Sequence, residues 1–287
     1  MGRLIRRLSS LAGLNPGAAG RICLCCLSAL LIPGHAVADA AEDLAWQNGL
    51  RTAYFGDRPI VESDDIIELE APDRAQFSAI VPIAVRAKFP QTPKRFIKTV
   101  TLLIDMNPSP LAGRFHFMQT SGRADLSMRV RINAYGPVRA IAETNDGKLY
   151  MSRRFVKGSG GCSAPAGADL EAAMVRLGKI KLKTRGPARP GQPLLAQLMI
   201  SHPNLTGLQM DQVTRLYMPA HFVKQVDVSF DGKPVLSAET DISISENPHF
   251  QFYFVPEQSG VLRVDVVDSK GLRFAKTHTV SPTVALN

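Results

Sequence analysis

The stretch Leu-Ser-Met-Arg-Val-Arg-Ile, residues 126–132, alternates apolar and polar side chains without interruption. Successive side chains of a β-strand point to opposite faces, so this period of two predicts a half-buried strand. Its apolar face is expected to line a core and consists of Leu126, Met128, Val130 and Ile132. Its polar face carries Arg129 and Arg131, which are expected to point outward into solvent.

Period-two segments recur on both sides of this stretch. Residues 138–144 and 148–156 flank Asn145-Asp146-Gly147, which is a strong hairpin turn signal. The other expected strands are 81–89, 97–105, 194–201, 223–230, 234–238, 249–255, 261–268 and 273–280. Strands do not alternate with helical segments, so a doubly wound fold is excluded. The sequence predicts an all-β protein of antiparallel β-sandwiches.

Breaks in this pattern divide the chain. Residues 43–55 carry an apolar face at helical spacing and end at Gly56, which predicts a short N-terminal helix before the strands. The glycine-rich residues 158–167 contain no large apolar side chain and read as a flexible linker. We therefore expect four parts: 1–38, a signal peptide; 39–157, a first sandwich; 158–176, a glycine-rich cysteine arm and linker; and 177–287, a second sandwich.

The N-terminus has the pattern of a secretory signal. Residues 1–21 contain four arginines and no acidic residue, an apolar run covers 22–32, and Ala36-Val37-Ala38 provides a small-residue cleavage site. The apolar run is short for a membrane span, and no later segment approaches 18 continuous apolar residues. The sequence thus predicts a periplasmic protein that starts at Asp39 and has no membrane contact after cleavage; a retained N-terminal anchor is the alternative.

Cleavage changes the cysteine count and the charge. It removes Cys23, Cys25 and Cys26, so Cys162 is the one cysteine left and cannot form an internal disulfide. The loss of four arginines lowers the formal charge from +9 to +5. The basic residues are spread along the chain, whereas a nucleic-acid partner would need them clustered with stacking aromatic residues. Nucleic acid is therefore excluded as a partner.

Cys162 is the candidate functional residue. Gly158, Gly160 and Gly161 surround it with backbone that lacks Cβ atoms, so the arm is expected to be thin and mobile. The basic residues just upstream are expected to favour the thiolate and to attract anionic reactants. They are Arg153, Arg154 and Lys157. Two plainer interpretations remain: a buried structural cysteine and a thiol that only links two chains by a disulfide.

Other chemistry lacks support in the sequence. The five mature histidines, His202 and His221 among them, form no helical His-x-x-x-His pair, and structural or surface roles are expected for them. No phosphate-binding loop, dinucleotide fingerprint or Gly-x-Ser-x-Gly motif is present. The sequence therefore predicts no metal, no cofactor and no catalytic activity of its own.

The landmarks of the two halves resemble a known pair of proteins. The first half and its Gly-Gly-Cys resemble SoxY, the substrate carrier of the Sox thiosulfate-oxidising system, through Phe55-Gly56, Val81-Pro82, Asn107-Pro-Ser-Pro110 and Gly160-Gly-Cys162. The second half resembles its partner SoxZ through Ile200-Ser-His-Pro203, Gly207, Met218-Pro-Ala-His-Phe222, Asn247-Pro-His-Phe250 and the hairpin 260–271. The order of the landmarks most resembles the fused SoxYZ-like carriers encoded near quinoprotein alcohol dehydrogenases.

This resemblance implies a function. It implies two immunoglobulin-like sandwiches and a covalent carrier that holds a small sulfur-containing, or otherwise thiol-reactive, cargo on Cys162. The implied partners are redox enzymes of a Sox-like or quinoprotein dehydrogenase system. The alternative is a non-covalent adapter or chaperone of an exported quinoprotein (PQQ) dehydrogenase, in which Cys162 is incidental.

One departure from SoxY concerns the arm. In SoxY the arm is a free C-terminus, whereas here a whole domain follows Cys162. At ~3.3 Å per residue, the six residues after Val156 limit its reach to roughly 20 Å. We expect an accessible Cys162 and weak order from Gly158 to Ala166, between two rigid sandwiches that pack together because each exposes strand edges.

Overall fold

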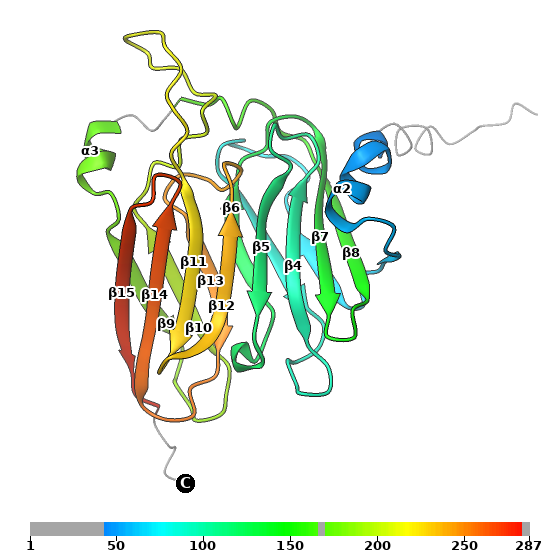
Figure 1. The fold of residues 1–287 in the computed structure, drawn as a ribbon, viewed down its shortest axis with the longest axis vertical. Helices are drawn as coiled ribbons and strands as arrows, with labels where there is room; N and C mark the ends of the chain where they lie inside the picture. The colour runs from blue at the N-terminus through cyan, green and yellow to red at the C-terminus, as the bar shows by residue number, and fades with distance from the viewer. Residues whose placement is uncertain (1–42, 166–169, 283–287) are drawn as a thin grey trace, which may run out of the picture.

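The protein consists of two β-sheets stacked face to face, with a few short helical segments around them (Figure 1). The structure is a computed structural model that describes residues 43–165 and 170–282. The expected signal peptide, residues 1–38, lies outside the described residues. Within them, no helix is long and apolar enough to span a membrane.

The larger sheet has nine strands and contains most of the predicted hairpins. Its order is β1 (Ile60–Glu62), β8 (Leu149–Val156), β7 (Gly136–Thr144), β4 (Ile97–Ile104), β5 (Leu111–Phe117), β12 (Lys233–Thr240), β11 (Val223–Phe230), β14 (Gly260–Asp268) and β15 (Arg273–Val280). All neighbours are antiparallel except β1 and β8. The turn at Asn145-Asp146-Gly147 joins β7 to β8, as the sequence predicts.

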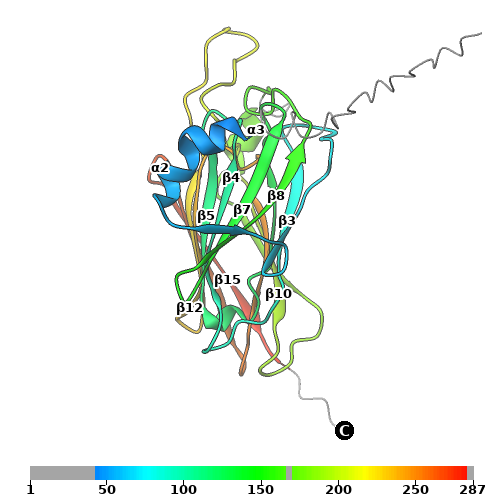
Figure 2. The same cartoon turned by 90° about the vertical axis from the view of Figure 1, so that its right-hand side faces the viewer.

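The smaller sheet has six strands and covers the other face of the core. Its order is β2 (Ile67–Glu70), β3 (Val81–Ala87), β6 (Leu126–Val130), β13 (His249–Phe254), β10 (Leu194–Ile200) and β9 (Ile180–Arg185). The alternating stretch at 126–132 supplies β6, at the centre of this sheet. Figure 2 shows the two sheets edge on, as two layers with the core between them. The prediction of an all-β protein built from antiparallel β-sandwiches is confirmed, and the two expected sandwiches share one pair of sheets.

The two halves of the chain join edge to edge. In the larger sheet β5 pairs with β12, from Phe117 opposite Leu236 to Gly113 opposite Thr240. In the smaller sheet β6 pairs with β13, with Leu126 opposite Phe252. One apolar core therefore runs through both halves. The expectation that the halves pack together is confirmed, and the mode is strand pairing that covers the open edges.

The helical segments are short. The expected N-terminal helix is present as a π-helical turn, η1 (Trp46–Leu50), followed by α2 (Arg51–Phe55), which ends at Gly56 with φ +61°. The others are a 3₁₀ turn, η2 (Gln119–Ser121), and α3 (Leu170–Val175). Trp46 packs with Leu103, Ile141, Leu149 and Met151 in a small second core on the outer face of the larger sheet.

Four strands were absent from the sequence prediction: β1, β2, β5 and β9. The first two have three and four residues, too few to show a period. Strand β5 begins directly after Asn107-Pro-Ser-Pro110 and contains Gly113, both of which read as turn signals. Its place is decided by the strands on both sides of it, because β4 and β12 each pair with it.

Candidate functional site: the cysteine arm

Cys162 lies in the segment that leaves β8 and runs toward α3 across one end of the sandwich, at the top of Figure 1. We call its described residues, 158–165, the cysteine arm. The arm contains turns and bends but no strand or helix. Cys162 itself is 0% exposed. The expectation of an accessible thiol was therefore wrong, because the body of the protein provides a cradle that the arm's own composition does not reveal.

Residues of the first half form one side of this cradle. The backbone N–H groups of Gly160 and Gly161 donate to the carbonyls of Asn133 and Ile132, at 2.8 Å and 2.9 Å. The Ser159 N–H donates to Ser78 Oγ at 2.9 Å. The Cys162 N–H donates at 3.4 Å to the side-chain oxygen of Asn133. These bonds attach the arm to the chain that follows β6 and to Ser78, which lies just before β3.

Residues of the second half form the other side. Thr206 Oγ1 donates to the Cys162 carbonyl at 2.6 Å, and Gln209 Nε2 donates to the Ala164 carbonyl at 2.9 Å. Both residues belong to the loop 205–221, which projects from the same end of the molecule (Figure 1). Cys162 thus sits at the seam between the two halves and is held by both.

The glycines of the arm have a role that the sequence prediction missed. A Cβ on Gly161 would lie 2.1 Å from the Ser78 carbonyl oxygen and 2.5 Å from that of Ile132. Both atoms belong to the backbone and cannot easily move aside. A Cβ on Gly158 would lie 2.9 Å from Ile132 Cγ2, and Gly160 has φ +71°. Gly158 and Gly161 permit close docking, and Gly160 permits a left-handed turn. Ala166, the last residue of the segment expected to be weakly ordered, lies outside the described residues.

Burial determines whether the Cys162 thiol is protonated. Removal from solvent raises the pKa of Cys162 to about 11, and the positive charge of Arg131 opposes this rise only in part. The docked thiol is therefore protonated at neutral pH. Because the thiolate is the nucleophilic form, Cys162 is unreactive while the arm stays docked.

The burial of Arg131 is the clearest difference between the structure and the sequence prediction. It lies one residue beyond the end of β6, on the face expected to be solvated, yet it is only 1% exposed. Its Nη1 donates to the Gly161 carbonyl at 3.1 Å, and its Nη2 donates to the Asn204 carbonyl at 3.3 Å. The arm and the 204–206 segment cover this face, so the outward direction of the side chain does not lead to water.

The three basic residues expected to support the thiolate have other partners. Arg153 pairs with Glu62 at 2.7 Å and with Asp43 at 3.0 Å. Arg154 pairs with Asp64 at 2.9 Å. Lys157 is exposed and forms a parallel β-bridge with Arg74. The cation whose charge acts on the thiol is instead Arg131.

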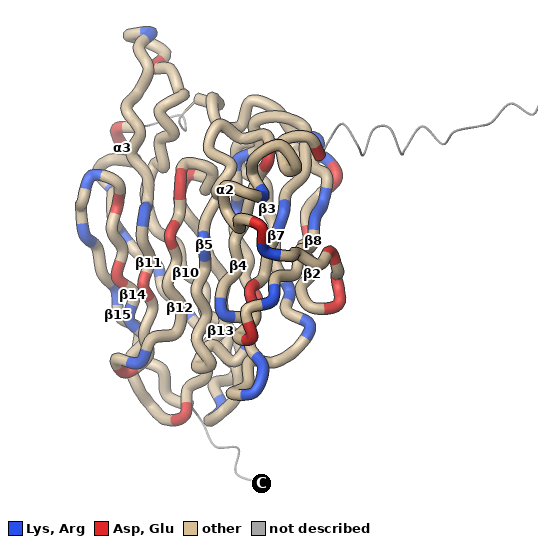
Figure 3. Tube along the Cα trace, turned by 45° about the vertical axis from the view of Figure 1, so that its right-hand side comes forward, with Lys and Arg blue, Asp and Glu red and all other residues tan. Residues whose placement is uncertain are grey.

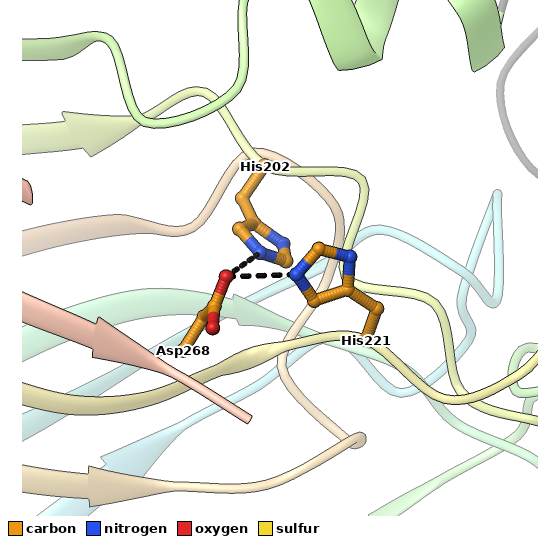
Figure 4. Close-up of side chains that lie close together, drawn as sticks. All are labelled: His202, His221 and Asp268. Carbon is orange, nitrogen blue, oxygen red and sulfur yellow. Dashed lines mark hydrogen bonds and ion pairs between the residues drawn. The ribbon is translucent and has the colours of Figure 1, made fainter. Parts of the chain in front are cut away.

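A buried polar cluster supports the second side of the cradle (Figure 4). His221 Nε2 lies 2.7 Å from Asp268 Oδ2, and His202 Nε2 lies 3.6 Å from the same oxygen. The two imidazole rings meet edge to face, 4.6 Å apart. Burial, and then the neighbouring His221, lowers the pKa of His202 to about 4, so His202 is neutral at pH 7. His202 links the cluster to the cradle, because the N–H of Asn204, two residues later, donates to His202 Nδ1 at 3.0 Å.

This cluster is the group of described residues with the spacing of a metal site, since its three ligand atoms lie within 4.8 Å of one another. The hydrogen bonds argue for a structural brace. His202 Nδ1 accepts from Asn204, so the neutral ring carries its proton on Nε2, the atom that would have to bind the metal. Burial works to raise the pKa of Asp268, but hydrogen bonds from His221 and from the backbone of Leu272 and Lys270 outweigh it and lower the pKa. The carboxylate is thus already satisfied.

The brace is continuous with the arm. Asn204 Oδ1 accepts from the Val223 N–H at 3.1 Å, its Nδ2 donates to the Ile244 carbonyl at 3.2 Å, and its own carbonyl accepts from Arg131. Asn107 secures the first half in a similar way, by donating to the Arg131 carbonyl and accepting from the Asn133 N–H. Asn107, His202 and His221 were noted as landmarks in the sequence, but Arg131, Asn133, Thr206 and Gln209 carried no signal there.

Charged residues are spread over the described surface, whereas large exposed apolar side chains occur together on the loop beside the arm. Basic and acidic residues are interspersed over the described surface (Figure 3). The projecting loop beside the arm exposes large apolar side chains, with Val213 90%, Leu216 69% and Tyr217 67% exposed. A cleft of about 810 Å³ lies elsewhere, lined by η2 residues together with Phe230 and Val255, and none of the predicted site residues line it.

The fold and the arm together define a class: a two-sheet, immunoglobulin-like protein that holds one cysteine on a glycine-rich arm. The sequence matches the family model of the sulfur oxidation protein SoxY over residues 51–162 and that of the sulphur oxidation protein SoxZ over residues 181–279. The chain therefore carries these two families in tandem and is a fused SoxYZ-like protein. The families indicate a carrier protein of sulfur oxidation.

Comparison with solved structures gives weak similarities. The sulfur carrier protein SoxY from Chlorobium limicola f thiosulfatophilum is 25% identical, with a TM-score of 0.34, over 42% of this chain and 99% of that one. A superoxide reductase (neelaredoxin) from Ignicoccus hospitalis is 18% identical, with a TM-score of 0.31, over 34% of this chain and 94% of that one. Scores this low do not inform on function. A search of curated protein sequences gave no match.

Proposed function

We propose that this chain is an exported, periplasmic carrier that binds a sulfur-containing cargo covalently through the Cys162 thiol and presents it to partner redox enzymes. In this proposal the chain does not itself transform the cargo. The proposal rests mainly on the extent of the family match. The SoxY model covers residues 51–162, so the last residue that it matches is Cys162 on the glycine-rich arm.

The structure adds a condition to this function. Cys162 is buried and protonated in the docked arm, so loading requires the arm to leave its cradle. The exposed thiolate then attacks a sulfur–sulfur bond of the cargo. The Sγ–S bond forms, the sulfur–sulfur bond of the cargo breaks, and the leaving sulfur departs as an anion. The docked state protects the thiol. After undocking, the six residues that follow Val156, with a reach of roughly 20 Å, deliver it to a partner.

A second candidate function is a non-covalent adapter, for instance of an exported quinoprotein dehydrogenase. The burial of Cys162 favours it, because a fully buried cysteine is usually structural. Two features weigh against an incidental cysteine. The arm is irregular backbone without an embedding strand or helix, and the guanidinium of Arg131 bonds the carbonyl of the residue next to Cys162.

Intact-mass measurement of protein from the exported fraction tests the carrier. We expect a mass increase on Cys162 that a reductant removes, and an N-terminus at Asp39. A Cys162→Ser variant should fold, keep its partner binding and lose function. Ser163→Ala is the matched control, since Ser163 is an exposed neighbour on the same arm. A Cys162→Ser variant that keeps full function would contradict the carrier and support the adapter.

A further inference from the structure

Two arginine side chains are completely buried among the described residues, Arg131 and Arg139. Arg139 is paired with carboxylates: its Nε donates to Asp105 Oδ2 at 2.8 Å, and its Nη2 pairs with Asp43. Arg131 has only neutral partners, the carbonyls of Gly161 and Asn204. An arginine stays protonated at any pH at which proteins fold, so each side chain is a buried positive charge.

The environment of Arg131 provides no carboxylate in direct contact with that charge. Its Nε is buried and has no hydrogen-bond partner. Among the described residues, Arg131 forms no ion pair within 4.0 Å. The acidic residue Glu246 acts on its charge from a greater distance. Burial of a cation without a counter-charge costs much free energy, and proteins usually avoid it. A site that keeps such a cation is preorganised for an anion.

The position of Arg131 shows where that anion belongs. Its Nη1 bonds the carbonyl of Gly161, the residue directly before Cys162, and Arg131 and the Cys162 thiol act on each other electrostatically. The thiol is neutral when docked, so the unloaded arm does not supply the missing charge. A sulfonate-type group on the sulfur would supply it, because it keeps its charge at neutral pH and presents several oxygens to the planar donor fork of a guanidinium.

We propose that Arg131 is an anion-binding residue that pairs with negatively charged groups carried on the Cys162 sulfur and thereby holds the loaded arm in its cradle. The inference rests on the proposed covalent carrier function and adds to it a residue that distinguishes charged from neutral cargo. An anionic adduct gains a charge-assisted pair on docking, a neutral adduct gains none, and a cationic adduct is repelled. Arg131 is thus a positioning residue that acts on the cargo's charge.

Three chemically loaded forms of the mature protein test this. Tetrathionate converts the Cys162 thiolate to Cys–S–S–SO₃⁻ and releases thiosulfate. Methyl methanethiosulfonate gives the neutral Cys–S–S–CH₃ and releases methanesulfinate. 2-Aminoethyl methanethiosulfonate gives the cationic aminoethyl disulfide with the same leaving group. Intact mass confirms each adduct, and amide hydrogen exchange of residues 158–165 then measures how firmly the arm is docked.

In the wild type we expect the arm amides of the anionic adduct to exchange about tenfold more slowly than those of the neutral adduct, since a charged hydrogen bond is worth about that factor. The cationic adduct should exchange fastest. In Arg131→Gln, which keeps a donor for the carbonyls but no charge, the anionic and neutral adducts should become equal. Arg131→Lys should restore part of the difference. Arg154→Gln is the matched control, since it also removes one positive charge, and it should keep the whole difference.

The outcomes separate the two proposals. If the wild type shows no advantage for the anionic adduct, or if Arg131→Gln keeps that advantage, Arg131 is a structural brace and the inference is overturned. If Arg131→Gln does not fold, the order of the three adducts in the wild type decides the matter without a variant. Native protein that carries no adduct, with full function in Cys162→Ser, overturns the carrier function itself, whatever the order of the chemical adducts.

Discussion

The two buried arginines of this protein occupy sites with opposite electrostatics. Arg139, on β7, bonds Asp105 and Asp43, lies 3.6 Å from Met151 Sδ, and stacks 4.6 Å from the centre of the Trp46 ring. Arg131, just beyond β6, meets only backbone carbonyls and leaves its Nε unpaired. Both side chains are large, fully buried and always charged, so the difference lies in what surrounds them.

That difference separates a structural charge from one kept for a ligand. In the Arg139 cluster, which we define as Arg139, Asp105, Asp43 and Trp46, the positive charge has two carboxylate partners, and the cluster attaches the N-terminal helical segment to the larger sheet. The Arg131 site provides two backbone carbonyls but no carboxylate, and it leaves the Nε without a hydrogen-bond partner. Buried cations without a counter-charge are rare because they are costly. Their presence beside a candidate carrier thiol is therefore informative.

The largest effect is expected at the Arg139 cluster. Arg139→Met leaves Asp105 buried without its partner, and breaking a buried pair in this way costs about 3–5 kcal/mol of the free energy of unfolding. Chemical denaturation measures it. Arg154→Met breaks an exposed pair and serves as the control, with an expected loss of about 1 kcal/mol or less. If both variants lost the same free energy of unfolding, the buried Arg139 pair would contribute no more to stability than an exposed pair.

The second effect concerns the pH dependence of Cys162. The docked arm favours the protonated thiol, so its stability is full below the ordinary thiol pKa of 9.0 and is lost progressively as the pH rises toward about 11. At pH 7 we expect alkylation by iodoacetamide to be about a hundredfold slower than for a free thiol, since two pKa units correspond to that factor. A rate at pH 7 equal to that of a synthetic arm peptide would mean that the arm is not docked in solution.

A third test releases the arm by a substitution in the arm itself, with both arginines kept. Gly161→Ala places a Cβ against the Ser78 and Ile132 carbonyls, and overpacking of this kind costs about 1–3 kcal/mol. The cost falls on docking, so alkylation of Cys162 should become about tenfold faster while the main unfolding transition stays in place. Ser163→Ala should leave the rate unchanged. If Gly161→Ala instead lowered the stability of the whole sandwich, the arm would be an integral part of the fold.

The smallest effect is expected at Arg131 in the unloaded protein. Arg131→Gln removes a buried cation that has no direct ion pair and keeps a donor for the two carbonyls, so the free energy of unfolding should change by about 1 kcal/mol or less. Denaturation under the conditions used for Arg139→Met gives the direct comparison. A loss as large as that of Arg139→Met would place both arginines in the structural class.

The sequence anticipated most of the strands but not their partners across the seam. The turn at Asn145-Asp146-Gly147 and the alternation at 126–132 are local signals, because turn geometry and side-chain direction depend on neighbouring residues. Strand β5 was missed because its pairing with β4 and β12 outweighs the glycine within it. Pairing between residues more than a hundred positions apart leaves no periodic signal in either segment.

For the candidate site, the sequence alone identified the cysteine and the glycines around it, since cysteine count and small-residue composition are properties of the chain itself. It also determined that Arg131 lies on the face of its strand opposite Val130 and Ile132. Only the tertiary structure decided that this face is covered, that Cys162 is buried, and that Thr206 and Gln209 of the second half hold the arm. Side-chain direction follows from local backbone geometry, whereas burial depends on which distant segments pack there, and this is why Arg131 points outward and yet never reaches water.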